Sequence, residues 1–231
     1  MSSTEGPPLR ILHQDDHLLA VDKPCGMPVQ DDPSGDASLT TLVAQLTSGL
    51  APAHRLDRPV SGVVLFARTP EMSAKLSALF RARAIGKIYW AVVEGKVEGE
   101  HRLEHALQRD GRARKSRLET GTPAGARSML HLRTLSAGDR YSLLEVSPGG
   151  GAFHQIRAQL AAWGHPIKGD VKYGARRGER GRDAAARSIA LHARSVTFDH
   201  PATGESMTVT APAPEGRIWQ VLLELAGIAG H

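Results

Sequence analysis

The hydrophobic residues of this chain fall in short runs that alternate with polar turns, a pattern typical of a sheet built largely from hairpins. Ile11-Leu12 and Leu18-Leu19-Ala20-Val21 flank a polar turn and predict an opening hairpin. Gly62-Val63-Val64-Leu65-Phe66-Ala67 predicts a buried strand. Further strands are predicted at residues 87–93, 141–146, 195–198 and 207–210, the last two as a hairpin.

Helices are predicted where a capping residue precedes an apolar stretch or where apolar residues recur at helical spacing. The predicted helices cover residues 39–46 after a cap at Ser38 or Asp36, residues 70 to about 83 after Thr69-Pro70, and residues 218–226. A fourth carries an apolar stripe of Phe153, Ile156, Leu160 and Trp163, can end at Gly164, and leaves His154 and Arg157 on a neighbouring face. We therefore expect an α+β fold, a mixed and largely antiparallel sheet with flanking helices, in one domain over residues 1–231 with a core of about 9–226.

The chain has 29 basic and 24 acidic residues, and the resulting net charge of +5 is by itself weak evidence for a nucleic-acid partner. The distribution of the charges along the chain says more. Arginines gather in two long stretches, from about 108 to 126 and from 174 to 186, which suit an anionic partner or an ordinary solvated loop. We interpret both as candidate flaps that contact RNA. There is no apolar run of eighteen residues and no secretory signal, so we expect a cytoplasmic protein without membrane contact. We also expect a monomer.

The segment His54-Arg55-Leu56-Asp57-Arg58-Pro59-Val60-Ser61-Gly62 is the strongest candidate for chemistry. It places a carboxylate between two arginines directly before a buried strand, and neighbouring cations favour the ionised form of a carboxylate. From local chemistry alone, a simple ion pair of Asp57 with Arg55 or Arg58 is the better explanation.

Five segments in order along the chain resemble motifs of the RluA family of pseudouridine synthases. These are residues 11–27 with Lys23-Pro24 and Gly26, the His-Arg-Leu-Asp run at 54–57, residues 87–95 around Tyr89, residues 154–174 from His154-Gln155-Ile156-Arg157 to Tyr173-Gly174, and residues 191–214. Two departures stand out. Val60 replaces a usual threonine, and Gly149-Gly150-Gly151-Ala152-Phe153 replaces a Thr-Gly-Arg-Thr approach to His154.

The resemblance implies a pseudouridine synthase fold and an isomerase that converts uridine in RNA to pseudouridine. It implies that Asp57 is the nucleophile, that Arg157 pairs with it, and that Tyr89 stacks on the flipped uracil or moves its proton. Leu191 or Ile189 would form an apolar floor under the base. His54 and Arg55 would help to hold the opened RNA.

No cofactor is expected. The histidines at 54, 154, 165 and 192 lack the spacing of a zinc site, and no Gly-Lys-Ser or Gly-Lys-Thr follows the glycine run, so we expect neither a metal nor a nucleotide cofactor. The expected partner is tRNA, ribosomal RNA or both. Two other classes remain in play: a non-catalytic RNA-binding or ribosome-assembly factor on the same fold, and an aspartate-based hydrolase, for which we find no second carboxylate motif.

Overall fold

The computed structural model describes residues 9–119, 127–176 and 188–229. In chain order the strands are β1 (Arg10–Gln14), β2 (Leu18–Lys23), β3 (Ala51–Pro52), β4 (Ser61–Ala67), β5 (Gly86–Glu94), β6 (Glu100–Asp110), β7 (Lys115–Leu118), β8 (Arg127–Ala137), β9 (Tyr141–Pro148), β10 (Leu191–Asp199) and β11 (Ser206–Thr210). The helices are α1 (Leu39–Leu46), α2 (Pro70–Arg81), α3 (Gln155–Ala162) and α4 (Arg217–Leu225), and a short 3₁₀ turn is η1 (Val171–Tyr173).

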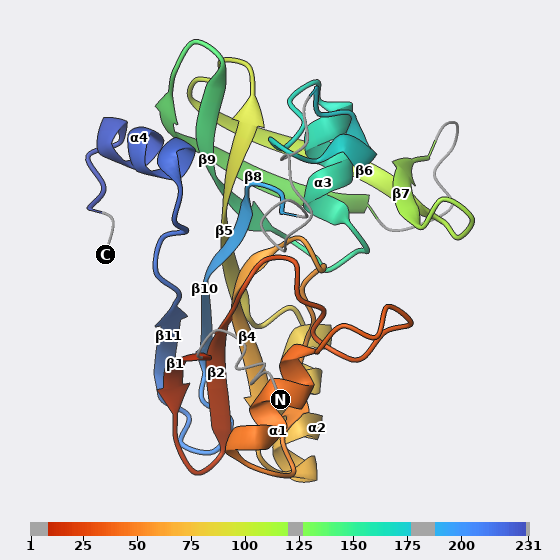
Figure 1. Cartoon of the computed structure of the whole chain (residues 1–231), viewed down its shortest axis with the longest axis vertical. Helices are drawn as coiled ribbons and strands as arrows, with labels where there is room; N and C mark the ends of the chain where they lie inside the picture. Colours follow the sequence, from red (N-terminus) through yellow and green to blue (C-terminus); the bar gives the residue numbers. More distant parts are fainter. Residues whose placement is uncertain (1–8, 120–126, 177–187, 230–231) are drawn as a thin grey trace, which may run out of the picture.

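One long sheet forms the spine of the molecule (Figure 1). Its strands follow the order β1-β2-β4-β10-β5-β9-β8-β6-β7, with β11 added beside β10 and β3 beside β4. Among the described strands only β4 and β10 pair in parallel, and the other neighbours are antiparallel. The predicted mixed and largely antiparallel sheet is therefore confirmed.

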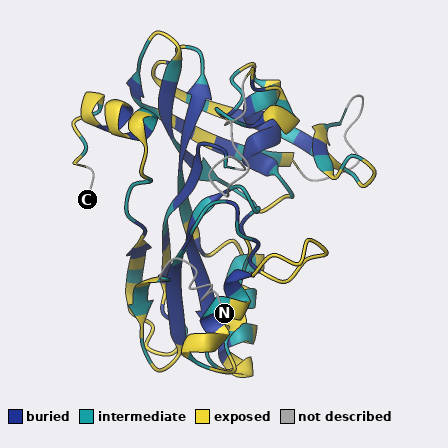
Figure 2. Ribbon diagram, viewed as in Figure 1, coloured by how far each residue is buried: buried dark blue, intermediate teal, exposed yellow. Residues whose placement is uncertain are grey.

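The inner strands are buried on both faces of the sheet (Figure 2). Successive side chains point to opposite faces, so β2 and β4 each contribute to two hydrophobic clusters. In β2, Leu19 and Val21 join one hydrophobic cluster, while Leu18 and Ala20 join another. Residues of α1, α3 and α4 belong to the first cluster, and those of α2 belong to the second. This double cover explains why β2 and β4 are continuous apolar runs instead of alternating patterns.

The predicted helices are present, and two begin at the predicted caps. The Ser38 side chain accepts a hydrogen bond from the Thr41 amide, and the Thr69 side chain accepts one from Met72. The fourth helix differs from the prediction. His154 takes a left-handed backbone with φ of 52°, so α3 begins at Gln155 and Phe153 lies outside it. Moreover, Gln155 to Leu160 are all buried, because the helix sits between the sheet and neighbouring segments instead of showing one apolar stripe.

Part of the first predicted loop is regular structure instead. β6 continues to Asp110 and pairs with β7 as an antiparallel hairpin, so the segment from 108 to 118 is a projecting ribbon. Strands β6 and β8 were not predicted. The rest of that loop, 120–126, and residues 177–187 of the second arginine-rich stretch lie outside the described residues.

Candidate active site

A cleft opens where the loop after β3, the middle of β5 and the start of α3 meet. The empty space between its walls, including open solvent at its mouth, is about 550 Å³. Its walls are formed by Arg55, Leu56, Asp57, Val60, Lys87, Tyr89, Pro148, Gly150, Gly151, Ala152, His154, Gln155, Ile156, Arg157 and Leu191. Five of the seven predicted site residues line this cleft: Arg55, Asp57, Tyr89, Arg157 and Leu191.

A buried lysine holds the loop that carries Asp57. Lys23 is fully buried at the end of β2, and its Nζ donates hydrogen bonds to the carbonyls of Pro24 at 2.9 Å, Met27 at 2.8 Å and Arg58 at 3.2 Å. The Arg58 carbonyl also accepts from the Gly26 amide at 2.9 Å. The Lys-Pro-x-Gly turn is therefore hydrogen-bonded to the loop that carries Asp57 and holds it in place.

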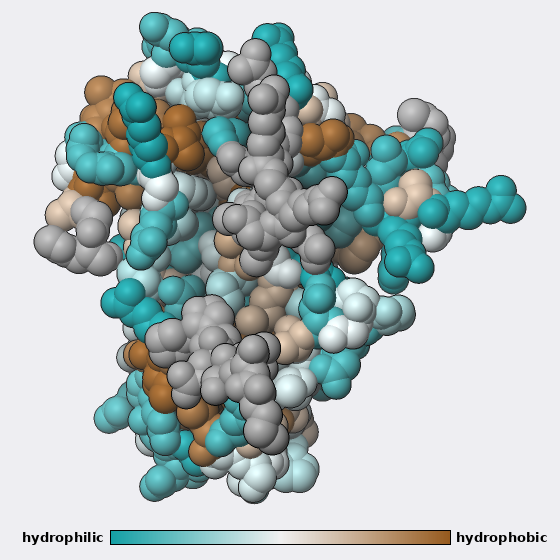
Figure 3. All heavy atoms as spheres, viewed as in Figure 1, coloured by the Kyte–Doolittle hydropathy of each residue, from teal (hydrophilic) through white to brown (hydrophobic). Residues whose placement is uncertain are grey.

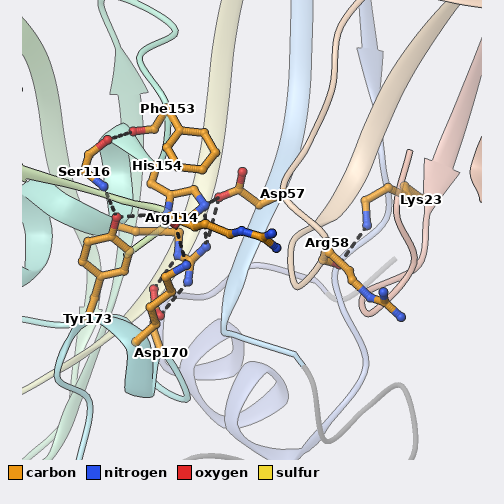
Figure 4. A network of polar contacts seen from close by, with 11 residues as sticks. Lys23, Asp57, Arg58, Arg114, Ser116, Phe153, His154, Asp170 and Tyr173 are labelled. Carbon is orange, nitrogen blue, oxygen red and sulfur yellow. Dashed lines mark hydrogen bonds and ion pairs between the residues drawn. The ribbon is translucent and has the colours of Figure 1, made fainter. Parts of the chain in front are cut away.

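Arg58 does not pair with Asp57, contrary to the ion pair suggested by local sequence. Its Nε donates to the Gly26 carbonyl at 2.8 Å, and its Nη atoms reach Asp32 and Asp36. Figure 4 shows the Arg58 side chain pointing away from Asp57. The arginine is directed to the acidic turn before α1, so it ties that turn to the loop.

The cation beside Asp57 comes from α3. Arg157 Nη1 donates to Asp57 Oδ2 at 3.1 Å, although the two residues are 100 positions apart. The Arg157 side chain is 6% exposed and that of Asp57 is 20% exposed, so the carboxylate faces the cleft and the guanidinium lies behind it. A guanidinium in this position orients a carboxylate and favours its ionised form.

Arg157 is itself held by Asp170, which no sequence argument assigned to the site. Its Nε and Nη2 donate to the two Asp170 oxygens at 2.7 and 2.8 Å, a bidentate pair, and the Asp170 side chain is 1% exposed. Burial alone would lower the pKa of Arg157, but the bonds and charges of Asp170 and Asp57 raise it overall. The Gly169-Asp170 dipeptide, within the segment 154–174 that resembles an RluA-family motif, is the sequence feature that could have pointed to Asp170.

His154 lies beside this ion pair. Its Nε2 is 3.4 Å from Asp57 Oδ2 and 3.3 Å from Arg157 Nη1, and its ring stacks on Phe153 at 3.8 Å between centroids. Burial, followed by the charges of Arg157 and Lys172, lowers the pKa of His154 to about 3. The imidazole is therefore neutral at physiological pH.

Tyr89 and Leu191 supply the flat and apolar parts of the cleft from the neighbouring strands β5 and β10. Burial, and then the negative charge of Asp57, raises the pKa of Tyr89, so its phenol stays protonated. Lys87 from the same strand donates to the Gly150 carbonyl at 2.7 Å, which fastens the glycine-rich turn to β5. This anchor lies in the segment that departs from the RluA pattern.

The remaining predicted residues are placed differently. Arg55 is exposed at the cleft. His54 is not among the lining residues: its ring packs on Phe80 of α2 at 4.7 Å, and its Nε2 accepts the Leu65 amide at 3.1 Å. Burial, with a smaller contribution from Lys87, lowers the pKa of His54 to about 4. Ile189 is 9% exposed and belongs to the core beneath the loop, where its amide donates to the Pro59 carbonyl at 3.2 Å.

Two further properties concern the described residues as a whole. Within those ranges, no group of three His, Cys, Asp or Glu side chains is arranged to hold a metal ion. No helix in the described part of the chain is long and apolar enough to cross a membrane. The cleft itself presents a paired carboxylate, a protonated tyrosine and a neutral histidine.

The mixed sheet and the cleft with an arginine-paired aspartate are the arrangement that the resemblance to pseudouridine synthases predicts. The family model described as RNA pseudouridylate synthase matches residues 17–162, and the chain belongs to this family. The resemblance to the RluA family is confirmed with it. The chain is therefore an RNA pseudouridine synthase, an isomerase.

Several bacterial relatives are named tRNA pseudouridine synthase C. The chain is 34% identical over 236 residues to the one from Haemophilus influenzae, a match that covers 95% of this chain and 98% of that protein. It is 32% identical to the one from Yersinia pestis, with 96% and 92% covered. For the relative from Pectobacterium carotovorum the identity is 32%, and the chain spans 58% of that protein's length.

Solved structures share the fold. Human RNA Pseudouridylate Synthase Domain Containing 1 superimposes with a TM-score of 0.74 at 23% identity, over 100% of both chains. Human RNA Pseudouridylate Synthase Domain Containing 4 gives 0.70 at 24% identity, over 94% of this chain and 93% of the other. These similarities confirm the predicted pseudouridine synthase fold.

Proposed function

We propose that this protein converts uridine to pseudouridine in tRNA, with Asp57 as the nucleophile. The observation that carries the proposal is the pairing of Asp57 with Arg157 at a cleft that also holds Tyr89. The choice of tRNA is supported by the relatives named tRNA pseudouridine synthase C. Ribosomal RNA is the alternative target.

The reaction breaks the bond between ribose and the uracil nitrogen N1, turns the base and rejoins it through carbon 5. An ionised carboxylate has three routes: attack on the anomeric carbon of ribose, attack on carbon 6 of uracil, or stabilisation of charge during an elimination. In each route Arg157 keeps the carboxylate oriented, and it is rigid because Asp170 holds two of its nitrogens.

The other residues take supporting roles in the same proposal. The ring of Tyr89 would stack on uracil. Its hydroxyl would act at carbon 5 only as a relay, accepting the proton that carbon 5 loses while passing its own proton on, because a protonated phenol is not itself a base. Leu191 would form the apolar floor, with Ile189 as the core beneath. The base must leave its stack to enter the cleft, at a cost of about a few kcal/mol. Arg55 would hold the opened strand, while His54 supports the loop.

A basic ribbon beside the cleft suits the phosphates of RNA. The β6–β7 hairpin carries Arg109, Arg112, Arg114, Lys115 and Arg117, all but Lys115 exposed. Figure 3 shows hydrophilic side chains extending from the part of the surface where this hairpin projects. Guanidinium groups release counterions from RNA on binding, so the contact should weaken with salt.

The proposal also includes that the chain forms a single catalytic domain, acts as a monomer and is located in the cytoplasm.

The test is to incubate the protein with total tRNA and, separately, with ribosomal RNA, and to map pseudouridine at single-nucleotide resolution. Asp57→Asn should abolish the product without loss of folding, because an amide is neither a nucleophile nor a charge. Asp16→Asn is the matched control, since Asp16 is an exposed turn residue away from the cleft. Product only in ribosomal RNA would refute the tRNA assignment. RNA binding without product in the unmodified protein would favour the non-catalytic alternative.

A further inference from the structure

Tyr173 contacts the ion pair from outside the cleft and has no part in the chemistry above. It closes the η1 turn, and its Oη is 2.9 Å from His154 Nδ1 and 2.7 Å from the backbone nitrogen of Ser116 on β7. Its ring lies 5.0 Å from the Arg157 guanidinium carbon. Figure 4 shows this chain of contacts running from Ser116 through Tyr173 and His154 to Asp57.

The direction of each bond follows from the groups that can only donate. A guanidinium has no acceptor, so the bond from Arg157 Nη1 to His154 Nε2 at 3.3 Å requires an unprotonated Nε2. The neutral imidazole then carries its proton on Nδ1 and donates it to Tyr173 Oη. The Ser116 amide is also only a donor. The Tyr173 oxygen therefore accepts two hydrogen bonds, which uses both of its lone pairs.

Removal of the Tyr173 oxygen would favour the other neutral tautomer of His154. Nδ1–H would lose its acceptor in a buried place, which favours transfer of the proton to Nε2. An Nε2–H group would meet the Arg157 donor at 3.3 Å and compete with it for Asp57 Oδ2, which is 3.4 Å away. The Arg157–Asp57 pair would then lose its geometry.

We propose that Tyr173 is a positioning residue, which fixes the tautomer of His154 and thereby keeps Arg157 paired with Asp57. The inference rests on the proposed role of Asp57 as nucleophile.

The second donor to Tyr173 belongs to the basic hairpin. The Ser116 hydroxyl donates to the Phe153 carbonyl. The Phe153 ring stacks on His154, and the Arg109 guanidinium is 4.6 Å from its centroid. Lys172 Nζ donates to the Arg114 carbonyl at 2.5 Å. The contacts of the β6–β7 hairpin with η1 therefore help to fix the position of the Tyr173 oxygen.

The test compares Tyr173→Phe with Tyr141→Phe, a matched control at the start of β9 that lies outside the cleft. Tyr173→Phe keeps the ring against Arg157 and removes only the oxygen. We expect the single-turnover rate at saturating tRNA to fall roughly 10- to 100-fold, as for a small misplacement of a reacting group, with KM within about twofold. Tyr141→Phe should leave both unchanged.

Nitrogen-15 chemical shifts of the imidazole give a readout that does not depend on turnover, with His154→Gln to assign the signal. The unmodified protein should show the Nδ1–H form and Tyr173→Phe the Nε2–H form. An Nε2–H form in the unmodified protein would overturn the proposal even if Tyr173→Phe does not fold. An unchanged rate in folded Tyr173→Phe would also overturn it. If the unmodified protein modifies no RNA, the proposed function fails, whereas the tautomer is still measured.

Discussion

Gly62 lies against Ala193 so closely that a β-carbon on Gly62 would be 2.2 Å from the Ala193 carbonyl oxygen. This contact is the parallel pairing of β4 with β10, and Gly62 also has a positive φ of 112°. The pairing sets the loop of Asp57 beside Leu191. The glycine that ends the motif is therefore required by the approach of two backbones.

Gly62→Ala should destabilise the fold strongly. Backbone strain contributes about 1–3 kcal/mol, and displacement of packed backbone adds a similar amount, so we expect a loss of about 2–5 kcal/mol in denaturant unfolding. Gly204→Ala separates the two causes, because Gly204 has a φ of 75° but nothing within 4 Å of an added β-carbon. Equal losses in both variants would show that strain alone acts at Gly62.

Asp170→Asn should impair catalysis from outside the cleft. The bidentate pair with Arg157 would lose its charge and one acceptor, so Arg157 would hold Asp57 less firmly. We expect a single-turnover rate lower by roughly 100-fold and a loss of about 3 kcal/mol in unfolding free energy. RNA affinity, measured by filter binding, should stay close to that of the unmodified protein. Asp199→Asn, at the exposed end of β10, is the control. A folded Asp170→Asn with an unchanged rate would contradict this role.

The sequence predicts those elements whose signal lies within one short stretch of residues. Continuous apolar runs predicted β2 and β4, and capping residues predicted α1 and α2. β6 was missed because its buried residues, Leu103 and Ala106, are three positions apart and do not alternate. β8 does alternate, with Leu130 and Leu132 buried and His131 and Arg133 exposed, a pattern that indicates a strand.

The site was only partly predictable, because its main contacts join residues that are far apart in the sequence. Arginines adjacent to Asp57 in sequence suggested its partner, yet Arg58 is drawn away by Asp32 and Asp36. The actual partner, Arg157, came from resemblance, because no local pattern links residues 100 positions apart. Long-range contacts such as Asp170 with Arg157 depend on how α3 and η1 pack, which residue spacing does not encode.

Stability at low pH should depend on Asp15, which joins the β1–β2 turn to the β10–β11 turn. Asp15 Oδ2 is 2.7 Å from His13 Nε2 and 3.3 Å from His200 Nε2. Burial opposes ionisation, but hydrogen bonds from His13 and from the His17 and Leu18 amides lower the pKa of Asp15 to about 2.

A lowered carboxyl pKa stabilises the fold fully above the unfolded value of 3.8 and loses that contribution as pH falls to about 2. Partial exposure of the group limits the effect to about 1 kcal/mol. Asp15→Asn keeps an oxygen for the two amides but cannot ionise. Urea unfolding from pH 6 to pH 2 should therefore fall less steeply in the variant, and parallel curves would exclude this contribution.

Tyr89→Phe should distinguish stacking from proton transfer at the base. The variant keeps the ring in the cleft beside Asp57 and removes only the hydroxyl, which the raised pKa keeps protonated and which could pass on the carbon-5 proton only as a relay. If the hydroxyl moves a proton at carbon 5, the rate should fall by about 10²–10⁴-fold, while KM changes little because stacking persists. Tyr89→Leu, which removes the ring as well, should raise KM in addition. A near-normal rate in Tyr89→Phe would leave the ring as a stacking surface and assign the proton transfer to another group.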